Sequence, residues 1–358
     1  MPRWREANRS GRDLSKGADG AVRILVTGGA GFIGSHFLRL LLTRDDVERV
    51  VNLDALRYSG NLENLRDVTP DPRYRFAHGD ICDAPTVESL FKEHRIDTIT
   101  NFAAETHVDR SILEPGAFVK TDVIGTAVLL EAARASGVRR FLQVSTDEVY
   151  GDVSTGRSKE SDPVVPRSPY AASKAAGDLL VRSYFTTYGM PILITRGSNT
   201  FGPNQYPEKF IPLFVTNALE EQPLPLYGDG LQEREWVHVE DHCAGIAHVL
   251  DQGMPGEIYN IGGGRERHNL DLAQAILKIL GKPDGLIRHI TDRPGHDRRY
   301  ALDSEKIRTL GWQTRRPFEE ALESTVFWYR DNPQWWGKIK SGEFRDYYQK
   351  LYGARLST

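Results

Sequence analysis

Tyr170 and Lys174 are the first residues whose types and spacing suggest chemistry. They lie four positions apart in the segment YAASK, and residues four apart share one face of an α-helix. Because an ammonium group lowers the pKa of a neighbouring phenol, this spacing predicts a phenolate that acts as a base near neutral pH. Ser168 and Pro169, directly before the pair, are typical of a helix start. Many pairs of this spacing only lie on solvated helix surfaces, so the prediction needs support from the rest of the chain.

A second polar cluster, Thr146, Asp147 and Glu148, directly follows an apolar run that ends at Ser145. In a doubly wound sheet, the carboxyl ends of the strands line the ligand crevice. Thr146 could donate a hydrogen bond to a carbonyl there. The two carboxyl groups could act as acid and base if their surroundings separate their pKa values. A polar loop with a helix-capping aspartate explains their position equally well, so position alone leaves both interpretations open.

Gly28, Gly31 and Gly34 form a G-x-x-G-x-x-G turn between an apolar run and a helical pattern. Such glycines let the backbone turn tightly, let phosphates approach, and let the helix pack closely on the strand. The helix N-terminus then offers unpaired N–H groups to a pyrophosphate. Asp54 ends the next apolar run, where a carboxylate accepts hydrogen bonds from ribose hydroxyls and repels a 2′-phosphate. The sequence therefore predicts a dinucleotide site that favours NAD over NADP.

The elements that must position these groups alternate regularly along the chain. Short apolar runs, typical of buried parallel strands, are separated by amphipathic helical patterns. This alternation predicts an α/β fold with a Rossmann-type doubly wound parallel sheet. The predicted strands are 23–27, 49–53, 74–77, 97–102, 141–145 and 192–195, and the clearest predicted helices are 35–42, 126–136 and 171–188.

The alternation of strand and helix patterns weakens beyond about Phe201, where prolines cluster among aromatic and charged residues. A strand–helix–strand pattern returns between residues 236 and 262. We therefore expect an NAD-binding domain and a smaller α/β substrate-binding domain that is partly interleaved with it. The expected division assigns 22–198 plus about 236–262 to the first domain, and about 199–235 plus 263–358 to the second.

Composition excludes several classes of protein. The 358 residues include 46 basic and 49 acidic ones, for a net charge of -3, which argues against extensive nucleic-acid contact or a polybasic membrane anchor. No apolar run approaches the roughly 18 to 20 residues of a membrane-spanning helix. Cys82 and Cys243 match no metal or redox spacing, so we expect no metal ion and a reducing cytoplasm. Residues 1–21 are polar and basic, which predicts a flexible leader rather than a signal peptide.

Taken together, the glycine turn, YAASK and STDEVYG (145–151) resemble the extended short-chain dehydrogenase/reductase family. Further segments narrow this resemblance to the dTDP-glucose 4,6-dehydratases within that family. The resemblance runs from about Arg23 to the C-terminal region. Its most diagnostic part is the Thr-Asp-Glu tripeptide, which nucleotide-sugar epimerases of similar fold usually lack. The additional matching segments are 54–65, 78–83, 101–112, 202–212, 234–242, 259–271 and 292–303.

The resemblance implies conversion of dTDP-glucose to dTDP-4-keto-6-deoxyglucose and water, for deoxysugar biosynthesis. Tyr170 would remove the C4 hydroxyl proton while hydride passes to NAD, and Thr146 would polarise the new carbonyl. Glu148 would remove the C5 proton, and Asp147 would protonate the departing C6 hydroxyl. Hydride would then return to C6. Lys174 would bind the nicotinamide ribose.

The resemblance also implies binding residues, position by position. Lys209, Arg234 and Arg293 make chemical sense as partners of a diphosphate. The implied cofactor contacts, besides the three glycines, Asp54, Tyr170 and Lys174, are Phe32, Ile33, Leu56, Asp80, Ile81, Ala103, Ala104, Thr106 and Thr121. The implied nucleotide-sugar contacts, besides Thr146 and those three cations, are His107, Asn199, Glu208, Tyr227, Asn269 and His296.

Two positions depart from the family pattern. Thr200 stands where the familiar relative has asparagine, which puts one cofactor or sugar contact in question. Arg57 stands where relatives often carry threonine or lysine, and its charge could weaken the discrimination against a 2′-phosphate that Asp54 provides.

Other functions remain as alternatives. They are a UDP-sugar 4-epimerase or decarboxylase, a GDP-mannose 4,6-dehydratase, and a catalytically silent NAD-binding regulatory module. The Asp147–Glu148 pair argues against an epimerase, which needs no second acid and base. We also expect a homodimer, because the family usually associates through two helices that match segments 117–135 and 171–188. Burial within one chain explains the apolar faces of these helices equally well.

Overall fold

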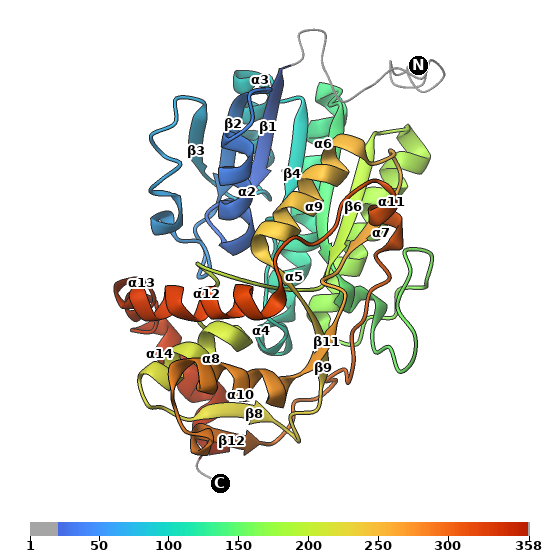
Figure 1. Ribbon diagram of the computed structural model, residues 1–358. Coiled ribbons are helices and arrows are strands. Elements are labelled where there is room, and N and C mark those ends of the chain that lie inside the picture. Colours follow the sequence, from blue (N-terminus) through green and yellow to red (C-terminus); the bar gives the residue numbers. More distant parts are fainter. Residues whose placement is uncertain (1–20, 357–358) are drawn as a thin grey trace.

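The computed structural model describes residues 21–356 (Figure 1). The leader expected at residues 1–21 lies, apart from its last residue, outside this range. Within the described residues, seven parallel strands form one sheet in the order β10-β6-β5-β4-β1-β2-β3. This order confirms the predicted Rossmann-type doubly wound sheet. The strands are β1 (Val22–Thr27), β2 (Val47–Asp54), β3 (Tyr74–His78), β4 (Thr98–Asn101), β5 (Arg140–Thr146), β6 (Ile192–Gly197) and β10 (Ile258–Ile261).

Helices cover both faces of this sheet because successive strand residues point to opposite faces. In β1, Ile24 and Val26 pack with residues of α2 and α9, whereas Leu25 packs with residues of α3, α6 and α7. Figure 1 shows α2 and α9 in front of the sheet. The helices are α2 (Phe32–Leu42), α9 (Val239–Gln252), α3 (Ala84–His94), α6 (Thr126–Ser136) and α7 (Pro169–Tyr188).

The direction change of the sheet lies between β1 and β4, which pair directly. From β1 the chain winds outward through β2 and β3, and from β4 it winds the other way through β5 and β6. Loops that follow neighbouring strands therefore diverge at this point and leave a crevice. After β4 come α4 (Val108–Leu113), α5 (Pro115–Phe118) and the π-helical η2 (Val119–Gly125), and a single 3-10 turn, η3 (Asp147–Tyr150), follows β5.

A second group of elements lies beside the carboxyl ends of the sheet strands, in the lower half of Figure 1. Strands β11, β9 and β7 form one small sheet, and β12 pairs with β8. Their core contains Phe201, Phe214, Leu272 and Tyr329. The strands are β7 (Asn199–Phe201), β8 (Leu224–Tyr227), β9 (Glu233–His238), β11 (Glu266–His268) and β12 (Ile287–Ile290).

The remaining helices complete the chain. Helices α8, α10 and α12 pack in the second group, and α13 and α14 follow in its C-terminal part. Short turns η1 (Leu62–Leu65), η4 (Asp284–Leu286) and η5 (Gln349–Gly353) connect other elements. The helices are α8 (Phe210–Leu219), α10 (Asn269–Leu280), α11 (Glu305–Thr309), α12 (Phe318–Asp331), α13 (Pro333–Ile339), α14 (Glu343–Tyr348) and α15 (Ala354–Leu356).

The strand–helix–strand pattern predicted at residues 236–262 is present, but its two strands belong to different sheets. The first strand, β9, lies in the small sheet, whereas α9 packs beside α2 and β10 extends the large sheet next to β6. The proline-rich region contains an element that the sequence did not suggest, since α8 includes Pro212 in its first turn. Proline is tolerated there because the first N–H groups of a helix have no partner within it.

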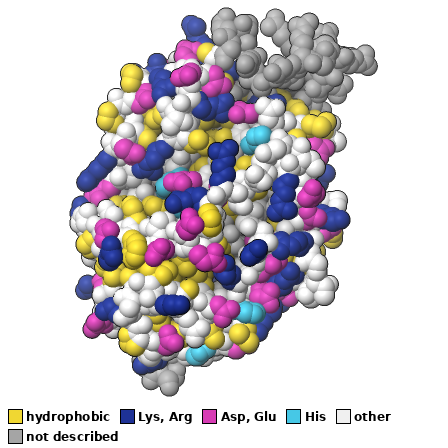
Figure 2. Space-filling model, viewed as in Figure 1, with side chains coloured by type: hydrophobic (Ala, Val, Ile, Leu, Met, Phe, Trp, Pro, Cys, Tyr) yellow, Lys and Arg dark blue, Asp and Glu magenta, His cyan; other side chains and the backbone are white. Residues whose placement is uncertain are grey.

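The surface and helix lengths add two observations. No helix within residues 21–356 is both long and apolar enough to cross a membrane. On the face shown in Figure 2, basic and acidic side chains are interspersed.

Asp178 and Arg196 form an ion pair inside the structure, with 2.9 Å between Asp178 Oδ2 and Arg196 Nε. Replacing Asp178 by alanine leaves a buried guanidinium without its carboxylate, so we expect unfolding stability to fall by about 3 to 5 kcal/mol. Urea unfolding measures this loss. The control is Asp331→Ala, which breaks the exposed pair with Arg330 and is expected to change stability little. Equal effects of the two substitutions would contradict the assignment.

Candidate active site

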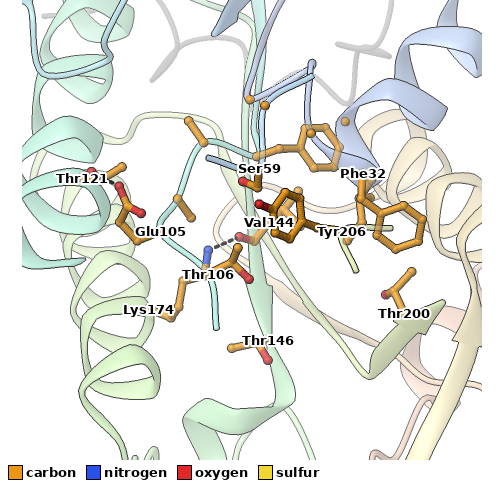
Figure 3. A pocket seen from close by; sticks show the side chains of 18 of the residues that line it. Phe32, Ser59, Glu105, Thr106, Thr121, Val144, Thr146, Lys174, Thr200 and Tyr206 are labelled. Carbon is orange, nitrogen blue, oxygen red and sulfur yellow. Dashed lines mark hydrogen bonds between the residues drawn. The ribbon is translucent and has the colours of Figure 1, made fainter. Parts of the chain in front are cut away.

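A cavity of about 310 Å³ lies at the carboxyl ends of β1, β4 and β5 (Figure 3). Its wall comes from the glycine turn, the ends of β2 and β5, the loop after β4, and α7. In Figure 3, Phe32 and Thr200 lie on one side of the cavity, and Glu105 and Thr121 lie on the other. This is the crevice that a doubly wound sheet leaves for a ligand.

The glycine turn has no room for side chains. Gly28 has φ +69°, and a Cβ on it would lie 2.8 Å from the Ala103 backbone nitrogen. A Cβ on Gly34 would collide with the Gly28 carbonyl oxygen and lie 2.8 Å from Gly29 Cα. The turn therefore keeps a bare backbone where the cavity meets the N-terminus of α2, which is the arrangement that a pyrophosphate requires.

Asp54 is fixed at the end of β2 by two backbone N–H groups. Its Oδ2 accepts from Ala30 N and its Oδ1 from Leu56 N, both at 2.8 Å. Burial raises the pKa of Asp54, although these two hydrogen bonds oppose the rise. The carboxyl group lines the cavity, where its remaining lone pairs can accept hydrogen bonds from a ribose.

Arg57, one of the two departures from the family pattern, is held by two carboxylates. Its Nη1 donates to Glu105 Oε1 at 2.6 Å and its Nη2 donates to Asp80 Oδ2 at 2.9 Å. A 2′-phosphate would have to compete with both acids for this guanidinium. The residues around the predicted adenosine end therefore fit NAD better than NADP.

The other predicted cofactor residues lie on the same wall, with one exception. Leu56 packs against the core of the large sheet and is not part of the cavity wall. It has a left-handed φ of 51°, and its N–H donates to Asp54 Oδ1. The predicted residues that line the cavity are Gly28, Gly31, Phe32, Ile33, Gly34, Asp54, Asp80, Ile81, Ala103, Ala104, Thr106, Thr121, Tyr170 and Lys174.

Tyr170 and Lys174 lie on the first turns of α7, whose start is capped as the sequence suggested. Ser168 Oγ accepts a hydrogen bond from Ala171 N at 3.1 Å. Lys174 Nζ donates to the Val144 carbonyl oxygen at 2.8 Å (Figure 3).

The predicted lowering of the Tyr170 pKa is wrong for this arrangement. Burial raises the pKa of Tyr170 well above its ordinary value, and the carboxyl groups of Glu148 and Asp122 add to the rise. A hydrogen bond with Thr146 opposes the rise but does not offset it. The expectation failed because it considered helix spacing alone, whereas burial and nearby acids dominate the electrostatics of this phenol.

Thr146, Asp147 and Glu148 lie at the end of β5 and the start of η3. Thr146 Oγ1 donates to Asp147 Oδ1 at 3.1 Å and accepts from Glu148 N at 3.3 Å. Thr146 thus caps η3, so the cap belongs to the threonine rather than to the aspartate.

The two acids have different surroundings. Asp147 is 3% exposed, and burial raises its pKa well above the ordinary value, with further contributions from Glu148 and Glu235. Burial also raises the pKa of Glu148, but Arg293, Arg234 and Lys209 oppose that rise. The environment therefore favours a protonated Asp147 more strongly than a protonated Glu148.

A second cavity of about 170 Å³ adjoins the first. Glu148, Tyr170, Asn199 and Lys209 line both cavities, so the two meet at the predicted acid–base groups. The predicted substrate residues are divided between them. Thr146 lines the first cavity, and the second is lined by His107, Asn199, Glu208, Lys209, Tyr227, Arg234, Asn269, Arg293 and His296.

Three cations lie on the wall of the second cavity, together with the carboxyl groups of Asp109, Glu148 and Glu208. Arg234 donates to the Asp297 carbonyl oxygen at 2.8 Å, and Lys209 Nζ donates to Thr106 Oγ1 at 2.8 Å. Arg293 faces Asp109, with 3.5 Å between Nη1 and Oδ1. Three cations thus surround a cavity that could hold a diphosphate.

Two predicted histidines are unsuited to carrying charge in this cavity. Burial lowers the pKa of His107 well below its ordinary value, with Lys209, Arg293 and Arg110 adding to the effect. Burial also lowers the pKa of His296 to about 4, although Asp292 opposes this. The surroundings of both side chains therefore disfavour the imidazolium form.

Sequence reasoning missed several wall residues. Glu105 and Asp109 lie within the segment 101–112 that the resemblance singled out, but no pattern marked them individually. Tyr352 comes from the C-terminal part of the chain and lies on the wall of the second cavity. Its contribution depends on tertiary packing, so no local signal could have identified it.

Thr200, the other departure, also lies on the wall of the first cavity. Its Oγ1 is 2.7 Å from Nδ1 of His242 and donates to the Ser198 carbonyl oxygen at 3.2 Å. The hydroxyl group therefore has partners within the chain, which an asparagine amide would contact differently.

Comparisons with known proteins agree with this geometry. Residues 25–325 match the family model described as GDP-mannose 4,6 dehydratase. A curated dTDP-glucose 4,6-dehydratase from Actinoplanes is 51% identical over 88% of this chain and 100% of its own length. Its counterpart from Escherichia coli is 44% identical over 90% of this chain and 98% of its own length.

Solved structures show the same similarity. DesIV, a dTDP-glucose 4,6-dehydratase from Streptomyces venezuelae solved with NAD bound, is 52% identical, with a TM-score of 0.87 over 89% of this chain and 100% of that one. A UDP-glucose 4-epimerase from Thermus thermophilus, also with NAD, is 33% identical, with a TM-score of 0.81 over 87% of this chain and 100% of that one. The fold is therefore shared with epimerases, whereas sequence identity is higher with the dehydratases.

Gly34→Ala tests the glycine turn. Because the added Cβ meets backbone atoms, the turn must shift, and we expect the Kd for NAD to rise roughly tenfold or more, equivalent to about 1.4 kcal/mol, so that less NAD stays bound in the purified protein. Cofactor released by denaturation can be quantified by chromatography. The matched control is Gly337→Ala in α13, where a Cβ meets nothing within 4 Å and NAD content is expected to be unchanged. Normal NAD content in Gly34→Ala would show that the turn does not hold the cofactor.

Proposed function

This chain belongs to the dTDP-glucose 4,6-dehydratase family, and from that premise we propose how its residues convert dTDP-glucose to dTDP-4-keto-6-deoxyglucose and water. The enzyme is an NAD-dependent hydro-lyase of deoxysugar biosynthesis. The observation that carries the proposed roles is the meeting of the two cavities at Glu148 and Tyr170. A sugar at this junction would contact the acids on one side, with its diphosphate among the cations of the second cavity.

Tyr170 is the proposed base for the C4 hydroxyl proton. Its position on both cavity walls supports this role, and Thr146 lies beside it at the end of β5. When bound, NAD would accept the hydride from C4 and return it to C6 after water has left, with a proton returning to C5, and its positively charged nicotinamide ring would favour a Tyr170 phenolate. Lys174 orients the ribose, and Thr146 donates a hydrogen bond to the C4 oxygen as it becomes a carbonyl.

Glu148 and Asp147 are the proposed base and acid of the elimination step. Glu148 takes the C5 proton, which the C4 carbonyl has made acidic, because nearby cations favour its ionised form. Asp147 gives its proton to the C6 hydroxyl, so that the C6–O bond breaks and water leaves with a C5=C6 double bond in the sugar. Its buried position supports this role, since burial raises the pKa of this carboxyl group and so favours its protonated form.

The diphosphate is the proposed partner of Lys209, Arg234 and Arg293. Two of these groups are held by neutral oxygens of the chain, namely Arg234 by backbone carbonyls and Lys209 by Thr106. Their charge therefore remains available to an anion. Arg293 would exchange its contact with Asp109 for a phosphate oxygen.

Incubation of variants with dTDP-glucose in heavy water distinguishes the role of the proposed acid from that of the proposed base. We expect Glu148→Gln to form reduced cofactor, seen in the near-ultraviolet, but to lose both dehydration and exchange of the C5 hydrogen for deuterium. Asp147→Asn should also lose dehydration, by roughly 10²-fold or more, yet retain C5 exchange because its base is intact. Product analysis by mass spectrometry and NMR distinguishes the two patterns.

Tyr170→Phe is the control for the first step and should form no reduced cofactor. If Asp147→Asn loses C5 exchange while Glu148→Gln keeps it, the two roles are reversed. If wild-type protein with NAD leaves dTDP-glucose unchanged but converts a UDP- or GDP-sugar, the substrate assignment is wrong.

A homodimer is the proposed assembly. Exposed apolar side chains gather on the helices that follow β4 and on α7, namely Leu113, Val119, Ile124 and Leu179, each at least 46% exposed. Ser173 of α7 donates to Asp122 of η2 at 2.6 Å, so these helices are neighbours. Pairing this surface with a second copy would bury side chains that otherwise face water.

Leu179→Arg should therefore convert a dimer to a monomer, because a guanidinium would be forced into the apolar interface. Light scattering after size-exclusion chromatography measures the mass of each species. The control is Met254→Arg, which changes a side chain that is 67% exposed and lies outside these helices. Wild-type protein that elutes as a monomer at micromolar concentration rules out the proposal.

The proposed location is the cytoplasm. Cys82 and Cys243 are both unpaired, which agrees with a reducing compartment. Cell fractionation followed by immunoblotting tests this location, and recovery in an extracellular fraction would contradict it.

A further inference from the structure

The indole N–H group of Trp236 has an unusual environment. Its side chain is 6% exposed, and its indole N–H has no hydrogen-bond partner in the described part of the chain. An unpaired buried donor costs about 1 to 3 kcal/mol, so its persistence calls for an explanation.

Other buried tryptophans of the described range do not share this feature. Trp312 donates to the Asp241 carbonyl oxygen at 3.2 Å. Trp335 donates to Asn64 Oδ1 at 2.9 Å, and Trp336 donates to the Tyr329 carbonyl oxygen at 2.8 Å. These indoles are satisfied within the chain, whereas Trp236 Nε1 is not. The difference points to a partner from outside the chain.

Strand alternation directs Trp236 toward the second cavity. Arg234 and Trp236 lie two residues apart on β9, and both line that cavity. Glu235, between them, points the other way and accepts from Leu302 N at 2.8 Å. The paired residue on β7, Asn199, also lines the cavity. Neighbouring groups on two strands therefore share one wall with the unpaired indole.

The position of Trp236 along the cavity system suggests which part of a ligand it meets. It lines only the second cavity, together with Phe214 and Asn269. Thr146 and Asp147, which belong to the proposed chemistry on the sugar, line only the first. Trp236 therefore lies on the side occupied by the nucleotide in the proposed binding mode.

We infer that Trp236 is a nucleotide-binding residue whose indole N–H donates a hydrogen bond to an oxygen of the nucleoside diphosphate. This inference rests on the proposed function for the orientation of the ligand. An internal alternative exists, because the rings of Phe201 and Trp236 form a T-shaped pair with 6.2 Å between ring centres. In that case the N–H would contact only an aromatic ring face, which is a weaker interaction.

Trp236→Phe removes the N–H while keeping an aromatic ring. We expect the Kd for dTDP, measured by calorimetry, to rise about tenfold, as for loss of one hydrogen bond to a charged acceptor. The KM for dTDP-glucose should rise by the same factor with kcat unchanged, because the interaction is present in the ground state and in the transition state alike. The thermal unfolding midpoint should fall only by the packing lost with the smaller ring, and so by less than in a variant that also loses an internal hydrogen bond.

Trp312→Phe is the matched control. It removes a hydrogen bond within the chain, so it should lower the unfolding midpoint and leave the Kd for dTDP unchanged. A measurement without any variant is the indole ¹H–¹⁵N signal of Trp236 in the wild type, which should move downfield when dTDP is added.

Unchanged dTDP affinity in Trp236→Phe, or an indole signal that dTDP does not move, would overturn the inference in favour of the contact with Phe201. A higher KM for dTDP-glucose with unchanged dTDP affinity would also overturn it, since the donor would then serve the sugar. Failure of the proposed reaction is distinguishable, because it leaves dTDP-glucose unconverted by the wild type, while the dTDP titration still decides the role of Trp236.

Discussion

The direct parallel pairing of β4 with β1 is the constraint on which the rest of the site depends. It places the glycine turn after β1 beside the loop after β4, so closely that a Cβ on Gly28 would meet the Ala103 backbone. Pairing of β5 with the other edge of β4 then brings Thr146 and η3 to the same end of the sheet. Groups more than a hundred residues apart in sequence are thereby held on one cavity wall by backbone hydrogen bonds. Side-chain interactions adjust this arrangement but do not create it.

The pKa values of the two site acids depend on which charged groups the neighbouring elements place beside them. Asp147 and Glu148 are adjacent in sequence, yet three cations of the second group of elements, Arg293, Arg234 and Lys209, oppose the effect of burial at Glu148, whereas Arg234 alone does so among the main influences on Asp147. Asp147 is instead affected by Glu235, whose carboxyl group is enclosed by backbone N–H donors of the loops near Gly264 and Leu302. Charged groups of the second group of elements therefore act differently on two neighbouring acids. A pair of identical functional groups can divide two tasks because each has different charged neighbours.

Much of the large sheet could be predicted from sequence, because buried parallel strands are continuous apolar runs and the helices between them are strongly amphipathic. The glycine turn was equally clear, since its spacing has a steric cause. The sequence did not reveal β7, β8, β11 and β12, which have three or four residues each, nor α8 with its Pro212. It also could not show that Lys174 contacts the Val144 carbonyl or that acids surround Tyr170. Those features depend on tertiary neighbours, and the roles of the site residues and the division into domains stay predictions.

The late return of the chain to the large sheet has a consequence for synthesis on the ribosome. After β6, the chain builds β7, α8, β8 and β9 before α9 and β10 complete the sheet. Until then, the open edge of β6 and the apolar face of α2 that contacts α9, including Phe37 and Leu38, lack their cover. The nascent large sheet thus passes through a stage with an unpaired strand edge, a feature that promotes aggregation. A shortened protein that stops after β6 would keep this strand edge unpaired and this helix face uncovered.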